Sequence, residues 1–302
     1  MARRLKRPEY KSLRLQKRIK HPVKIPSVYR LTKTASKTLW GNKKIFIGIT
    51  LVYGLLNLLL VQGIAGSNDA SSLKASFDDA FSGSLGSLVS GFGVFAFMVG
   101  SAGNANSQTA GAYQLFLALI GSLAMIWALR QVLSGKKIRI RDSFYKGMYP
   151  LIPYILVLLV VGLQLLPFLI GSTMYTLVIN NGIAVLPIER ILWALLYFLL
   201  ALLSLYMLAS SVFATYIVTL PDMTPLNALR SARELVKHRR WTVLRKIICL
   251  PIILLAVAAI IMLPIIMLAT FLAQWVFFIL TMSALIATHT YMYTLYRELL
   301  NE

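Results

Sequence analysis

The fold is decided by the stretch from Ile247 to Tyr296, IICLPIILLAVAAIIMLPIIMLATFLAQWVFFILTMSALIATHTYMYTLY, which contains no Asp, Glu, Lys or Arg. At 1.5 Å per residue, this stretch would be about 75 Å long as a helix. A bilayer core is about 30 Å thick and takes about 20 apolar residues per crossing. The stretch is therefore too long for one transmembrane helix. It predicts two, near 248–269 and 273–295, joined by a turn within 270–275.

Four further apolar stretches of spanning length precede this one, near residues 45–62, 112–132, 149–170 and 191–219. The composition agrees with them. Hydrophobic residues make up 58% of the chain, which is more than the core of a soluble domain requires, and only 14% of the residues are charged. We therefore predict an all-α polytopic membrane protein with about six transmembrane helices. It would consist of a basic cytoplasmic tail over residues 1–26 and a transmembrane helical domain over residues 27–302.

The positive charge predicts which side of the membrane each loop occupies. The net charge is +21, and nearly all of the 31 Lys and Arg lie in clusters or near the C-terminus, at residues 3–44, 130–146, 230–246 and 297. The exceptions are Lys74 and Arg190. Cytoplasmic loops are enriched in Lys and Arg, so the clusters and both termini are expected inside. The basic clusters can all lie inside only if the apolar segment Ser84–Ala102 does not cross the membrane. We therefore predict that Ser84–Ala102 forms a re-entrant or surface-lying helix on the outer side.

Short basic segments beside the spans have the spacing of amphipathic helices. Apolar residues recur at helical intervals with Lys or Arg between them over 27–40, 139–149 and 225–241. Such helices lie in the membrane interface with their basic side towards the headgroups. Indole rings also favour that level, and all five Trp fall at predicted interfaces: Trp40, Trp127, Trp193, Trp241 and Trp275. We therefore add interfacial amphipathic helices to the predicted fold.

One of these segments resembles a known family. The sequence from Asn227 to Lys237, NALRSARELVK, is similar to an A-L-x-x-S-x-x-L-V-K pattern of the bacterial membrane domain found beside glycerophosphoryl diester phosphodiesterases, and of related integral membrane proteins. The pattern matches at Ala228, Leu229, Leu235, Val236 and Lys237. Ala232 stands where the pattern has Ser. The resemblance implies a six-helix bundle in the cytoplasmic membrane of a bacterium. It does not imply the phosphodiesterase, whose soluble catalytic domain has no counterpart here.

No motif for catalysis, a metal or a cofactor is present in the sequence. The three His residues, His21, His238 and His289, are not at ligand spacing, and a metal site needs several converging ligands. The glycines fit no phosphate-binding loop. We therefore expect no enzyme, no metal and no cofactor. Small residues do recur at every fourth position, at Gly83, Ser87 and Gly91, a spacing that lets helices pack closely.

The basic residues predict an anionic partner. Each Lys or Arg near an anionic leaflet contributes about 1 kcal/mol of membrane binding. The cations that we predict to bind anionic lipid of the inner leaflet lie in the tail and around the last basic loop: Arg3, Arg4, Lys6, Arg7, Lys11, Arg14, Lys17, Arg18, Lys20, Arg230, Arg233, Lys237, Arg239 and Arg240. An acidic partner such as RNA, DNA or an acidic protein face is the alternative for the tail. Other membrane proteins and a second copy of the chain are further candidate partners.

The spans contain no Asp or Glu at mid-membrane depth, whereas ion-coupled transport usually relies on ionisable residues there. We therefore predict a non-enzymatic scaffold, assembly or membrane-organising factor. The alternative is a permease-like protein for a lipid or an apolar solute, because such a pathway needs no buried charge. A large cavity lined by Asn57, Gln164 or Tyr side chains would favour that alternative.

Overall fold

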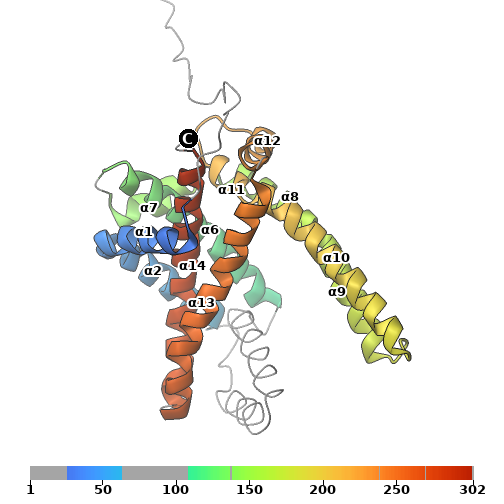
Figure 1. The fold of residues 1–302 in the computed structure, drawn as a ribbon. Helices are drawn as coiled ribbons and strands as arrows, with labels where there is room; N and C mark the ends of the chain where they lie inside the picture. Colours follow the sequence, from blue (N-terminus) through green and yellow to red (C-terminus); the bar gives the residue numbers. More distant parts are fainter. Residues whose placement is uncertain (1–25, 63–107, 137, 238, 269, 301–302) are drawn as a thin grey trace, which may run out of the picture.

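The computed structural model describes residues 26–62, 108–136, 138–237, 239–268 and 270–300 (Figure 1). The described residues are 87% helical and contain no strand, which confirms the all-α prediction. Six helical segments among them are long and apolar enough to cross a membrane: Lys43–Val61, Gly111–Leu133, Leu151–Asn180, Pro187–Ile217, Arg240–Met262 and Trp275–Leu300. The prediction of about six spans is therefore confirmed.

The first part of the bundle contains α1 (Val28–Gly41), α2 (Lys43–Asn57), its continuation η2 (Leu58–Gln62) and α6 (Gln108–Leu133). Ser27 caps α1, because its side chain accepts a hydrogen bond of 3.4 Å from the backbone N–H of Arg30. The α6 helix runs antiparallel to α2 and packs against α2 and η2. The α6 helix therefore begins at the same end of the bundle at which η2 ends. The predicted helix over Ser84–Ala102 lies outside the described residues.

The middle part contains α7 (Ile140–Gly147), α8 (Leu151–Gln164), α9 (Leu166–Asn180), α10 (Pro187–Ser211), α11 (Ala214–Ile217) and α12 (Pro225–Val236). The third span, predicted to end at 170, continues through α8 and α9 to Asn180, and the fourth begins at Pro187 rather than 191. The polar residues just after 170 do not end the helix, because the hydroxyls of Ser172, Thr173 and Thr176 donate to backbone carbonyls three or four residues earlier.

The last part contains α13 (Arg240–Leu268) and α14 (Thr270–Leu300). The turn predicted within 270–275 is therefore misplaced, because those residues already belong to α14. Ala273 explains the earlier helix start. It is buried against Ala258 and Met262 of α13, so the first turn of α14 packs on its neighbour.

The densest packing surrounds α6. Between Leu123 and Leu129, six of its side chains are at most 1% exposed: Leu123, Ala124, Met125, Ile126, Ala128 and Leu129. A helix that is buried on every face occupies the centre of its bundle. Gly147 lets α7 approach this centre closely, since a Cβ there would lie 3.0 Å from the Cα of Ala124 and 3.1 Å from the carbonyl oxygen of Leu123.

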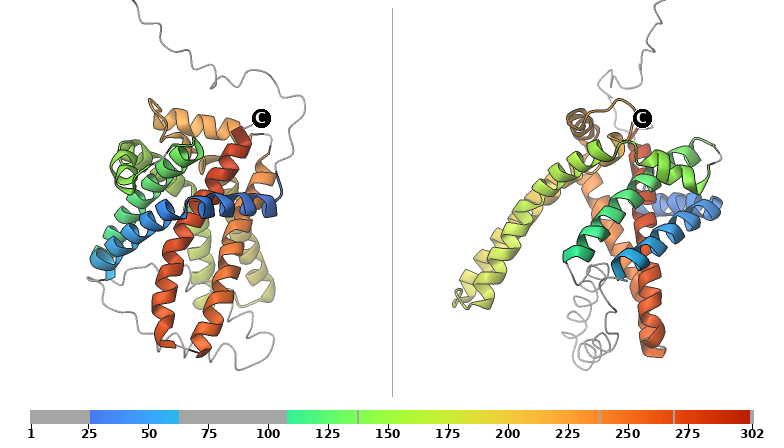
Figure 2. Two further views of the ribbon diagram at one scale, coloured as in Figure 1. Left: turned by 90° about the vertical axis from the view of Figure 1, so that its left-hand side faces the viewer. Right: turned by 180° about the vertical axis from the view of Figure 1, so that it is seen from behind.

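The α9–α10 hairpin leans away from the rest of the bundle (Figures 1 and 2). Only 6% of the most apolar window of the α10 span is buried, against 44% for the α6 span. Gly182, with φ of 64°, permits the tight turn at the hairpin tip. The hairpin exposes Leu, Ile and Phe side chains along most of its length. Lipid can cover such a surface, which in water would favour aggregation.

Candidate functional site: the basic end of the bundle

The predicted binding residues divide into two groups. The tail cations from Arg3 to Lys20 and the packing residues Gly83, Ser87 and Gly91 lie outside the described residues. The remaining cations lie on α12, in the short link after it and at the start of α13. We call this end of the molecule, which also holds the end of α14 at Leu300, the basic end (Figure 1).

The α12 helix has one small-residue face and one basic face. Ala228, Ala232 and Val236, spaced four residues apart, are fully buried, and α12 packs against α8, α10 and α11. Arg230, Arg233 and Lys237 are exposed, as is Leu226 at 75%. The helix therefore rests on protein through small residues rather than on lipid through leucines. The cations of the predicted basic face are exposed, and Leu226 is exposed with them.

Arg240 is separated from the α12 cations because it begins α13 and turns towards α10. Its guanidinium lies over the ring of Tyr206, with 4.7 Å from the guanidinium carbon to the ring centroid. Its Nε atom is buried without a hydrogen-bond partner. Tyr206 is a residue that the sequence analysis missed, because nothing in the spacing of α10 singles it out.

Lys246 has a structural position that the charge count did not indicate. It is only 3% exposed, and its Nζ atom donates a hydrogen bond to the carbonyl oxygen of Pro26. Its own carbonyl oxygen accepts a hydrogen bond of 3.2 Å from the hydroxyl of Tyr291 on α14. These bonds attach the start of the described chain to α13 and α14. The point at which the basic tail joins the bundle is therefore fixed at the basic end.

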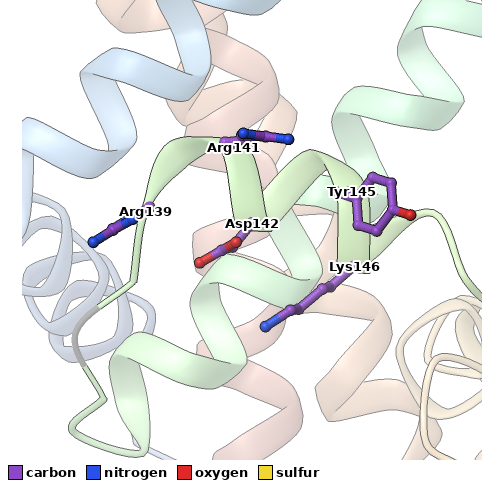
Figure 3. Close-up of a pocket in the computed structure, with 5 residues that line it drawn as sticks. All are labelled: Arg139, Arg141, Asp142, Tyr145 and Lys146. Atoms are coloured by element: carbon purple, nitrogen blue, oxygen red, sulfur yellow. The ribbon is translucent and has the colours of Figure 1, made fainter.

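A shallow depression of about 320 Å³ lies beside α7 (Figure 3). It is lined by Arg139, Arg141, Asp142, Tyr145 and Lys146. The side chains in Figure 3 spread around the helix instead of pointing at one place. The depression adds positive charge to this part of the surface without forming a convergent binding site.

A polar cluster lies inside the bundle next to the basic end. His289 of α14 forms hydrogen bonds with Tyr216 of α11 (3.1 Å to Nδ1) and with Ser122 of α6 (2.9 Å to Nε2). Tyr154 of α8 also hydrogen-bonds to Ser122. One polar chain therefore joins four helices, and each of these side chains has a partner within it. His289 is therefore packed inside the bundle, where it cross-links helices.

Arg130 fixes the same region from α6. Its guanidinium donates to the carbonyl oxygen of Thr219 at 2.8 Å, to that of Tyr216 at 3.5 Å and to the Thr219 hydroxyl. These oxygens lie at and just beyond the end of α11, so Arg130 acts as a cap for that short helix. Arg130, which the charge pattern placed in a cytoplasmic loop, lies in the last turn of α6.

The described residues contain no group of three His, Cys, Asp or Glu that could hold a metal ion. The side chains that form the hydrogen bonds described above are cations, hydroxyls and one imidazole, a set suited to cross-linking helices. Together with the six spans, this arrangement defines a polytopic α-helical membrane protein with a basic end. Comparison with protein-family models, curated proteins and solved structures finds no match to the chain. The family resemblance of residues 227–237 therefore stays a prediction.

Proposed function

We propose that this protein is a non-enzymatic scaffold, assembly or membrane-organising factor in the cytoplasmic membrane of a bacterium. Both termini would be cytoplasmic, and the basic tail and the basic face of α12 would bind anionic lipid of the inner leaflet. The positive-inside rule supports this orientation, because α7, α12 and the start of α13, which carry clusters of cations, lie towards the same end of the bundle (Figure 1).

The observation that carries the proposal is the filled centre around α6. Leu123 to Leu129 is buried on every face apart from the half-buried Trp127, so no pathway runs beside this part of the helix. Nearby polar groups are paired with one another, as the bonds of His289 to Tyr216 and Ser122 illustrate. These polar groups cross-link helices instead of lining an open space.

The architecture of the basic end supports a role in binding a charged surface. Small residues hold α12 on the bundle, which leaves Arg230, Arg233 and Lys237 exposed on its other side. Lys246 fixes the base of the tail at the same end through Pro26. Cations on α12 and cations of the tail can therefore act on one surface, and their contributions add when geometry permits simultaneous contact.

The proposal can be tested with the full-length protein in nanodiscs of neutral phosphatidylcholine. We expect these discs to sediment with vesicles that contain phosphatidylglycerol and not with vesicles of phosphatidylcholine alone. Salt should release them, because the screening length falls from about 10 Å at 0.1 M to about 3 Å at 1 M. Replacing the nine tail cations named above and the three α12 cations with Gln should abolish sedimentation.

The matched control replaces every Arg in the same set with Lys, which preserves the charge and should preserve binding. Failure of the wild-type discs to sediment with anionic vesicles at low salt would refute the lipid-binding part of the proposal. Capture by RNA without capture by vesicles would instead support the alternative partner of the tail. Transbilayer movement of a labelled lipid in proteoliposomes would support the permease-like alternative.

A further inference from the structure

The α10 and α13 helices meet at the basic end and separate below it. The contact between Arg240 and Tyr206 joins the start of α13 to the last turns of α10. From there, the α9–α10 hairpin and α13 diverge, so that their far ends stand apart (Figures 1 and 2). The two helices thus share a polar apex, and their separated parts can be covered only by lipid, by a partner or by another segment.

Below the apex, both helices continue as apolar surface. At 100° per residue, Leu199 and Leu195 lie on the same side of α10 as Tyr206, and they are 55% and 52% exposed. The same spacing places Ile247 and Pro251 below Arg240 on α13. Pro251 is exposed, whereas Ile247 is half-buried and packs partly against the core. Each helix therefore has one polar residue at the apex. Below it, α10 presents an exposed apolar stripe and α13 presents the exposed Pro251. This is the polarity pattern of a phospholipid.

The apex has the chemistry of a phosphate site. Stacking on Tyr206 covers one face of the Arg240 guanidinium, and its Nε atom is buried, so a ligand would be bound through the N–H groups of the two terminal nitrogens. Arginine pairs with phosphate through two parallel N–H donors of this kind. The next residue, Trp241, is 71% exposed, and indole rings favour the headgroup level of a bilayer. Arg240 therefore lies at the depth of a lipid phosphate.

We infer that α10 and α13 together hold one anionic phospholipid, with its phosphate on Arg240 and its acyl chains along Leu199, Leu195 and Pro251. This site deepens the proposed function, and it rests on the part of that proposal which places the basic end at an anionic leaflet. It does not depend on the tail. A second copy of the chain fits less well, because its own basic end would stand beside Arg240 in the same leaflet, and like charges repel.

Native mass spectrometry of the full-length protein tests this inference. The protein would be loaded with equal parts of phosphatidylcholine and phosphatidylglycerol in mild detergent, and the retained lipid would be measured as collision energy rises. We expect one phosphatidylglycerol to remain after phosphatidylcholine is lost. Arg240→Gln should lower this retained fraction about tenfold, as expected for the loss of a charge-assisted hydrogen bond.

Lys136→Gln is the matched control, because it removes one exposed cation in the loop between α6 and α7, away from the proposed site. It should retain the lipid as the wild type does. Leu199→Trp places an indole on the apolar stripe without changing charge, and it should also lower retention. Because Leu199 is exposed, we expect Leu199→Trp to fold, so lipid retention can be measured in this variant even if Arg240→Gln fails to fold.

Three results would overturn the inference. The first is equal retention of both lipids by the wild type. The second is unchanged lipid retention in a folded Arg240→Gln variant or in Leu199→Trp. The third is a dimer of the protein that holds no lipid. The last would identify a second copy as the occupant. The variant in which the tail cations and the α12 cations are replaced with Gln separates this site from the proposed function, because it should lose vesicle binding and keep its lipid.

Discussion

The contact between α7 and α6 allows a quantitative prediction about Gly147. A Cβ at this position would lie 3.0–3.2 Å from three backbone atoms of Leu123 and Ala124. Backbone atoms in the centre of the bundle cannot rotate away as a side chain can, so Gly147→Ala must move α7 outwards. Overpacking of this kind costs about 1–3 kcal/mol. For a protein of this size, 1 kcal/mol corresponds to a change in melting temperature of about 2–4 °C.

Two other glycines provide matched controls that differ only in what the added Cβ meets. At Gly48 the Cβ would meet the end of the flexible Ile140 side chain, which can change rotamer. At Gly162, inside α8, it would meet nothing within 4 Å, and Ala is favoured over Gly in a helix by about 1 kcal/mol. The expected order of melting temperature is therefore Gly162→Ala highest, Gly48→Ala intermediate and Gly147→Ala lowest.

The single cysteine of the chain, Cys249, provides the assay. It lies in α13 and is half-buried, so unfolding increases its reaction with a thiol-reactive fluorophore. The melting temperature can be read from this fluorescence in detergent for the three variants and the wild type. If Gly147→Ala melts at or above Gly162→Ala, then α7 does not pack on the α6 backbone as described.

Three further outcomes test the polar contacts and the topology. Tyr216→Phe removes one partner of His289, and it should destabilise the protein by about 1–3 kcal/mol in the same thermal assay because a buried polar atom loses its hydrogen bond. Arg130→Gln should free the carbonyl oxygen of Thr219 and increase proteolysis of the link between α11 and α12, with unchanged cleavage refuting a capping role. A topology reporter fused after Gly103 should appear on the outer face, and a cytoplasmic signal would require the span assignment to be redrawn.

The number of spans could be predicted from the sequence because it depends on average properties. Hydropathy over about twenty residues and the distribution of Lys and Arg do not require knowledge of neighbours. Helix ends were less predictable, because they depend on single hydrogen bonds. Ser172 and Thr173 look like a boundary in the sequence, yet their hydroxyls bond within the helix and α9 continues. The start of α14 was likewise decided by the packing of Ala273 on α13.

The candidate site was predictable only as a charge pattern. The sequence showed that cations gather around α12, but not that they have separate structural roles. Arg130 and Lys246 hold backbone carbonyls of distant segments, at Thr219 and Pro26, whereas Arg233 is exposed. Such a division depends on which side chains the fold places within reach of a free carbonyl. It cannot be read from spacing along the chain.

The distribution of packing gives the two ends of the molecule different roles. Around α6 and α11, close contacts, Arg130 and His289 join helices into a rigid base. Away from the basic end, the α9–α10 hairpin has few protein neighbours and presents apolar side chains. Because the hairpin stands apart, its exposed surface must be covered by lipid or by another protein.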